Sequence, residues 1–167
     1  MVNFKEDERL NTLNHSCAHL MAQAVRHLYP RAKFWVGPVV EEGFYYDMDL
    51  GGVMLNEDDL AAIEKEMKKI CKENLAIERF ELPRDEAIAF MEEREEPFKV
   101  ELINDLPEGV PISFYRQGEF TDLCAGPHVD RTGRIKHNAF KLLACNAAYW
   151  RGDAKRETLQ RIYGIAF

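Results

Sequence analysis

The chain has 167 residues, of which 46% are hydrophobic and 31% are charged, and its formal net charge is −7. This composition is typical of a soluble globular protein with a hydrophobic core. The negative charge argues against a protein that binds long stretches of nucleic acid, because phosphate contacts need clustered Lys and Arg. It permits an enzyme that binds only the end of a nucleic acid.

The first predicted element is a helix over Thr12–Tyr29, where apolar residues recur near the helical period and Pro30 follows the end. Strands are predicted next, over Ala32–Val36 and Phe44–Leu50. Glu57–Lys72 carries one apolar face and one charged face, so it is predicted to be an amphipathic helix.

Helices and strands continue to alternate in the second half of the chain. Leu75–Leu82 predicts a strand, and Pro83 starts a helix that runs to about Glu93. Phe120–Cys124 leads into a turn at Gly126-Pro127. Further strands are predicted over Phe98–Ile103, Pro111–Arg116, Lys136–Leu142, Ala147–Trp150 and Leu159–Phe167.

This order of elements predicts an α+β fold, with helices packed on an antiparallel or mixed sheet. We expect residues 1–167 to form one domain, in which the acidic helices of 56–96 could form a small inserted lobe. The chain contains neither G-x-G-x-x-G nor G-x-x-x-x-G-K-[ST], so nothing indicates a nucleotide-phosphate cradle.

Two further features concern the cellular compartment. No apolar run approaches the roughly 20 residues that a membrane helix needs, and residues 1–9 do not resemble a secretion signal. The four cysteines are irregularly spaced, which favours reduced thiols over a disulfide framework. We therefore expect a cytoplasmic protein that does not contact membranes.

Two short segments carry most of the reactive side chains. His15 and His19 lie one helical turn apart, on one face of the first predicted helix. About 100 residues later, Asp122, Cys124 and His128 flank a turn. Thiolate and neutral imidazole can bind zinc, and imidazoles can do acid–base work near neutral pH. Each segment alone is weak, and only the fold can show whether they form one site.

Simpler interpretations exist for several other residues. His27 is expected to be a solvated helix residue, and His137 an ordinary strand residue. Cys17 points away from the two histidines and is expected in the core. On pattern alone, Tyr46 would be a strand aromatic and Lys99 a solvated strand lysine.

Several segments resemble the second N-terminal domain of threonyl-tRNA synthetases, in order and at the expected spacings. The matching segments are His15–Leu20, Gly37–Val39, Gly43–Asp47, Phe120–His128, Ala148–Asp153 and Leu159–Gly164. Alanyl-tRNA synthetase editing domains share the paired His and Cys-His patterns but lack the Tyr-Trp-Arg-Gly-Asp ending found at 149–153.

The resemblance implies an α+β editing domain of the threonyl/alanyl type, which removes serine from mischarged Ser-tRNA(Thr). Its implied partners are the 3′ end of tRNA(Thr) carrying serine and the remainder of a threonyl-tRNA synthetase. The resemblance also implies a pocket lysine at Lys99, and contacts from Tyr46 and Asp122 to the terminal adenosine or the aminoacyl group. The pocket itself would be formed by His15, His19, Cys124 and His128.

Threonyl editors work, by this resemblance, without a metal, so no cofactor is expected. One alternative is an alanyl-type hydrolase, which would bind zinc through His15, His19, Cys124 and His128. Another is a tRNA-binding module without catalysis. Because no class II aminoacylation motifs follow, we expect this chain to act as an excised domain or a free-standing editor, and not to make Thr-tRNA itself.

Ester hydrolysis needs a positioned water, a proton acceptor and a group that stabilises the developing oxyanion. We expect His15 to orient or deprotonate the water, and Lys99 to hold a second water or the charged oxygen. His19, His128 and Cys124 would shape the pocket and bind the amine and hydroxyl of serine. A covalent intermediate on Cys124 is not required for an ester this activated.

Overall fold

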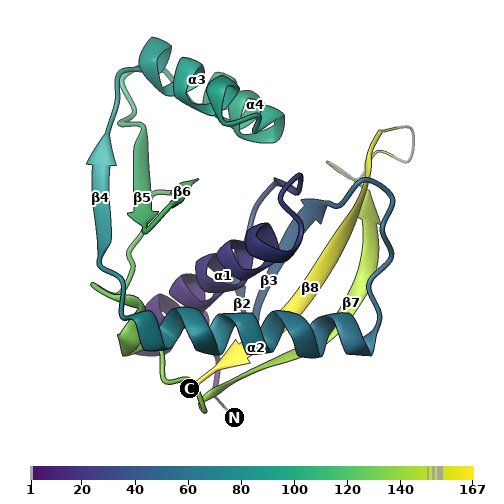
Figure 1. The fold of residues 1–167 in the computed structure, drawn as a ribbon. Coiled ribbons are helices and arrows are strands. Elements are labelled where there is room, and N and C mark those ends of the chain that lie inside the picture. The colour runs from purple at the N-terminus through teal and green to yellow at the C-terminus, as the bar shows by residue number, and fades with distance from the viewer. Residues whose placement is uncertain (1, 150, 152, 154–155) are drawn as a thin grey trace.

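The computed structural model describes residues 2–149, 151, 153 and 156–167. Within them, two antiparallel sheets and four α-helices form the α+β fold predicted from the sequence, and that prediction is confirmed (Figure 1). The helices are α1 (Glu8–Leu28), α2 (Glu57–Glu73), α3 (Arg84–Glu93) and α4 (Pro97–Asp105), with a short 3-10 turn η1 (Thr132–Arg134).

The larger sheet has five strands in the order β1-β3-β8-β7, and β2 adds to β3. The smaller sheet has the order β4-β5-β6. The strands are β1 (Lys33–Phe34), β2 (Val39–Val40), β3 (Gly43–Asp49), β4 (Ile77–Glu81), β5 (Ser113–Gln117), β6 (Phe120–Leu123), β7 (Phe140–Tyr149) and β8 (Thr158–Ala166).

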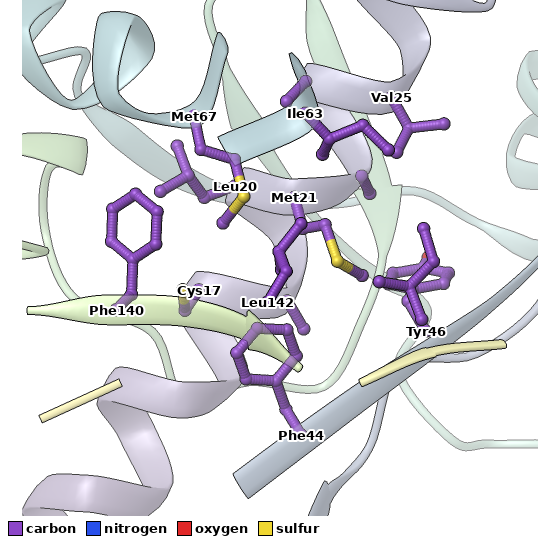
Figure 2. Close-up of a cluster of buried hydrophobic side chains, with 14 of the residues drawn as sticks. Cys17, Leu20, Met21, Val25, Phe44, Tyr46, Ile63, Met67, Phe140 and Leu142 are labelled. Carbon is purple, nitrogen blue, oxygen red and sulfur yellow. The ribbon is translucent and has the colours of Figure 1, made fainter. Parts of the chain in front are cut away.

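Helix α1 is the core helix of the larger part of the molecule. The Asp7 side chain caps its start by accepting a hydrogen bond from the Leu10 N–H at 3.0 Å. Leu20 and Met21 are fully buried, and Figure 2 shows them between α2 and the larger sheet. The Asn14 amide exchanges two hydrogen bonds with the Ala166 backbone, which fixes α1 against β8. A helix buried on so many sides is a rigid base for a site.

The segment 56–96 is divided between two hydrophobic clusters. Helix α2 sends Ile63 and Met67 into the core around α1, as Figure 2 shows. Beyond it, β4 joins β5 and β6, and α3 and α4 pack on this small sheet through the second cluster. The members of that second cluster are Ala87, Met91, Ile103, Ile112 and Phe114.

The prediction of a strand over Phe98–Ile103 is wrong, because these residues lie in helix α4. Pro97 occupies the first helical turn, where its fixed φ and missing N–H are tolerated. The buried residues Lys99 and Ile103 are one turn apart, which is a helical period. The run is short, and an apolar run of this length does not distinguish a strand from a helix by periodicity.

The two strands predicted over Lys136–Leu142 and Ala147–Trp150 form one long strand, β7. It begins only at Phe140, and its pairing with β8 shifts register between Leu142 and Ala144. Trp150 lies outside the described residues. No helix of the described residues combines the length and apolarity required to traverse a bilayer.

Candidate active site

A cavity of about 200 Å³ opens where α1, β3, α4 and β6 converge, between the two sheets. The loop that follows β1 closes one side of it. Its walls therefore come from segments far apart in the sequence. The lining residues are His15, His19, Val36, Gly37, Pro38, Tyr46, Lys99, Leu102, Asp122, Leu123 and Cys124.

The two reactive segments of the sequence meet at this cavity. The Sγ of Cys124 lies 3.2 Å from Nε2 of His15 and 3.2 Å from Nε2 of His128. The His128 ring centroid lies 4.3 Å from that of His15 and 4.2 Å from that of His19. The structure thus places the three imidazoles and the thiol in one cluster.

The smaller sheet and the turn after β6 hold Cys124 in place. The Cys124 N–H donates to the Ser113 carbonyl at 3.1 Å, and the Ser113 hydroxyl donates to the Cys124 carbonyl at 2.6 Å. Gly126 has φ +81°, and a Cβ there would lie 2.1 Å from the Tyr115 hydroxyl. Only glycine therefore fits the turn, and its N–H donates to Cys124 Sγ at 3.3 Å.

Asp122 organises a second group of polar side chains beside the cluster. Its carboxylate is 2% exposed. It accepts the Tyr46 hydroxyl at 2.5 Å and forms an ion pair of 2.8 Å with Lys99. His19 Nε2 lies 3.3 Å from the same carboxylate. Since His19 belongs to both groups, the cluster and the Asp122 network form one continuous polar site.

Lys99 is buried at the start of α4, so its interpretation as a solvated strand lysine is wrong. Its ammonium has three N–H donors, and each has a partner. They reach the Trp35 carbonyl at 2.7 Å, the Tyr46 hydroxyl at 2.9 Å and Asp122. To bind anything in the cavity, Lys99 must therefore release one of these partners.

Burial sets the charge state of the cluster. It lowers the pKa of His15, and it lowers the pKa values of His19 and His128 further, with help from the neighbouring imidazoles. Burial also raises the pKa of the Cys124 thiol to about 12 and that of the Tyr46 phenol well above its usual value. At neutral pH the cluster therefore consists of three neutral imidazoles and a protonated thiol.

Three residues that the sequence analysis set aside lie away from the cavity. Cys17 is fully buried in the core, as expected. His27 contacts Glu66 and Glu119 at the surface, so it is paired as well as solvated. His137 is exposed in the turn before β7, and not in a strand.

Sequence reasoning missed several residues that shape the site. Ser16 lies inside the His15–His19 motif and contacts His128, although its spacing carries no signal of its own. Trp35 contributes its backbone carbonyl, which no sequence pattern reveals. Leu102 reaches the cavity because α4 is a helix, so the error at Phe98–Ile103 concealed it.

Residues 112–163 match the family described as the threonyl and alanyl tRNA synthetase second additional domain. This match places residues 112–163 in that family. The resemblance identified from the sequence is thereby confirmed. The matched segment includes Cys124 and His128 of the cluster and most of the two strands β7 and β8.

The whole chain is also similar to parts of longer enzymes. All 167 residues align at 55% identity with the threonine–tRNA ligase of Acetivibrio thermocellus. The identity is 57% with those of Clostridium tetani and Carboxydothermus hydrogenoformans. The alignment covers 26% of each of these relatives, so the chain spans about a quarter of their length.

The cluster also meets the basic requirements of a zinc site in such a domain. His15, His19, Cys124 and His128 each offer one ligand atom, and these atoms lie within 4.8 Å of one another. Around tetrahedral zinc, with bonds of about 2.0–2.3 Å, ligand atoms lie roughly 3.3–3.8 Å apart. The side chains fit zinc in type and nearly in spacing, provided that Cys124 loses its proton.

Proposed function

We propose that this chain hydrolyses the ester bond of Ser-tRNA(Thr), as the editing part of a threonyl-tRNA synthetase. The proposal depends on one observation: His15 and Cys124 both line the cavity, and Nε2 of His15 lies 3.2 Å from Cys124 Sγ. The family match supports a role with aminoacyl-tRNA. The partners would be the serine-bearing 3′ end of tRNA(Thr) and the rest of the synthetase, in the cytoplasm.

In the proposed reaction, His15 Nε2 removes a proton from a water while the water oxygen attacks the ester carbonyl. The carbonyl carbon becomes tetrahedral, and its oxygen takes the negative charge. The bond from that carbon to the ribose oxygen then breaks, and the protonated His15 returns the proton to the ribose oxygen. Free serine and deacylated tRNA result. The pKa of His15, held below 6.5 by burial, suits this role because the base is already neutral at pH 7.

Lys99 would stabilise the tetrahedral oxyanion. Its ammonium lines the cavity but is fully hydrogen-bonded, so the oxyanion would have to replace one partner. We propose that Tyr46 is that partner, because its hydroxyl keeps its bond to Asp122 when Lys99 turns away. The positive charge then lies next to the developing negative charge in a site with little water.

The size of the cavity supports the selection of serine. At about 200 Å³ it is smaller than common ligand pockets of roughly 300–1,000 Å³, so it would admit the aminoacyl end and exclude the adenine base. Attraction alone distinguishes one methyl group by only about 10–200-fold. Exclusion of the threonine methyl, with His19 and Cys124 as walls, would add to this.

Cys124 would serve as a wall and hydrogen-bond partner and not as a nucleophile. Burial raises the pKa of its thiol to about 12, which leaves almost no thiolate at neutral pH. The seryl ester is also activated enough for direct attack by water.

A zinc-dependent hydrolase of the alanyl type is the second candidate, favoured by the four ligand atoms within 4.8 Å. The holders would be His15, His19, Cys124 and His128. When bound, zinc would act as a Lewis acid on the ester carbonyl. Elemental analysis of protein purified without chelator, together with hydrolysis of Ser-tRNA(Ala), distinguishes this candidate from the first.

The main experiment compares deacylation of Ser-tRNA(Thr) and Thr-tRNA(Thr) by the chain. We expect the serine ester to be hydrolysed at least about tenfold faster. His15→Ala should lower the single-turnover rate about 100-fold or more, whereas His137→Ala, an exposed histidine far from the cavity, should not. Equal rates for wild type and His15→Ala would remove His15 from the mechanism. Binding of tRNA without turnover would instead support a non-catalytic module.

A further inference from the structure

Ser16 is a fully buried hydroxyl between the two histidines of α1. Its Oγ accepts the backbone N–H of Val129 at 2.9 Å and lies 3.0 Å from Nδ1 of His128. These are its hydrogen bonds among the described residues. A hydroxyl has one proton to donate, and a backbone N–H cannot accept it. The proton of Ser16 therefore belongs on the bond to His128, whose Nδ1 must carry a lone pair.

This assignment determines the next bond. With Nδ1 unprotonated, neutral His128 carries its hydrogen on Nε2, which faces Cys124 Sγ at 3.2 Å. The sulfur also accepts the Gly126 N–H at 3.3 Å. Two donors thus point at the sulfur, and the thiol proton is directed to the remaining neighbour, Nε2 of His15 at 3.2 Å.

His15 completes the series. A hydrogen bond to the Pro127 backbone raises the pKa of His15, against the larger lowering by burial. The backbone of Pro127 has a carbonyl but no N–H. A carbonyl only accepts, so His15 donates to it, and Nδ1 is the nitrogen left for this bond because Nε2 faces Cys124. His15 therefore carries its lone pair on Nε2, on the side of Cys124.

We propose that Ser16 is a positioning residue, whose single hydroxyl proton holds His128 in the Nε2–H tautomer and thereby keeps the lone pair of His15 on Nε2, the nitrogen beside Cys124. The bonds run in one direction, from Ser16 to His128, to Cys124, to His15 and to the Pro127 carbonyl. If His128 carried its proton on Nδ1, its Nε2 would accept the thiol proton instead, and His15 would lose its partner. The effect of Ser16 on catalysis depends on the proposed hydrolysis, but its effect on the tautomer does not.

The test is imidazole nitrogen NMR of the metal-free chain with ¹⁵N-labelled histidine. Wild type should show His128 as the Nε2–H tautomer. Ser16→Ala should show a mixture or the Nδ1–H form, together with a fall in kcat for Ser-tRNA(Thr) of about tenfold, which is the effect of one hydrogen bond. KM should change little, because Ser16 does not line the cavity.

Ser113→Ala is the matched control. It removes another buried hydroxyl that holds the Cys124 loop but touches no imidazole, so the tautomer of His128 should stay as in wild type. An Nδ1–H tautomer in wild type would overturn the proposal even if Ser16→Ala did not fold. An unchanged tautomer in Ser16→Ala would overturn it as well. Absence of deacylation by wild type would contradict the proposed function. The NMR spectra would still show whether Ser16 determines the tautomer of His128.

Discussion

Lys99 and Asp122 form a buried ion pair of 2.8 Å that joins α4 to β6, with side chains 3% and 2% exposed. Lys99→Met should leave the Asp122 carboxylate uncompensated and lower the unfolding free energy by about 3–5 kcal/mol. Urea denaturation followed by circular dichroism measures this change. The exposed pair Arg134–Asp130 is the control, and Arg134→Met should leave the midpoint unchanged. If both variants changed the unfolding free energy by a similar small amount, the Lys99–Asp122 pair would not stabilise the fold as predicted.

The chemistry of this site could be read from the sequence more readily than its geometry. The residue types at His15, His19, Cys124 and His128 have distinctive spacings, and the resemblance to synthetase domains linked segments that are distant in the chain. The main helices were predicted because their apolar residues recur at a regular period, which depends only on local sequence.

The remaining contacts depend on tertiary packing. The Trp35 carbonyl accepts a hydrogen bond from Lys99, which lies 64 residues later in the sequence. Every residue has a backbone carbonyl, so a sequence pattern cannot indicate which one makes this contact. The sequence pattern predicts a solvated Lys99 in a strand, but tertiary contacts bury it in a helix. Ser16 acquires its role only when the Val129 N–H and the His128 ring come to lie around it.

Gly37 makes room for the Tyr46 ring. A Cβ at Gly37 would lie 2.3 Å from the ring atom Cδ2, so Gly37→Ala must displace Tyr46 from Lys99 and Asp122. We expect a loss of about 1–3 kcal/mol in unfolding free energy and slower deacylation. The measurement is a double-mutant cycle with Tyr46→Ala, in which Gly37→Ala should cost much less. If Gly37→Ala lowered the unfolding free energy equally in wild type and in Tyr46→Ala, the new methyl group would not be in contact with the Tyr46 ring.

Cys124 should be chemically inert despite its place in the cluster. With a pKa of about 12, only about 10⁻⁴ of the thiol is ionised at pH 8, so alkylation by iodoacetamide should be slow. Cys124→Ser should retain deacylation within about tenfold, because the hydroxyl can replace the thiol as a hydrogen-bond partner. Rapid-quench analysis with labelled serine should detect no seryl thioester on the protein. A labelled adduct that disappears in Cys124→Ala would establish covalent catalysis instead.

Glu96 makes the stability of the fold depend on pH. Its carboxylate pairs with Arg26 at 2.6 Å at the start of α4, yet burial raises its pKa to about 7, against the opposing pull of Arg26 and Lys99. The unfolded pKa is about 4.5. Because the folded pKa is higher, the native state holds the proton more tightly between pH 4.5 and 7. Glu96 therefore contributes most stability below pH 4.5 and loses it as the pH rises through 7.

Glu96→Gln should remove this pH dependence, because its amide is uncharged throughout and its carbonyl can still accept the Phe34 N–H that Glu96 binds at 3.3 Å. Between pH 5 and pH 8, wild type should lose up to about 3 kcal/mol more unfolding free energy than the variant. Urea unfolding of both proteins at the two pH values gives the comparison, in which ionisations common to both cancel. If wild type instead gained stability relative to the variant at pH 8, attraction to Arg26 would outweigh burial, and the folded pKa of Glu96 would lie below 4.5.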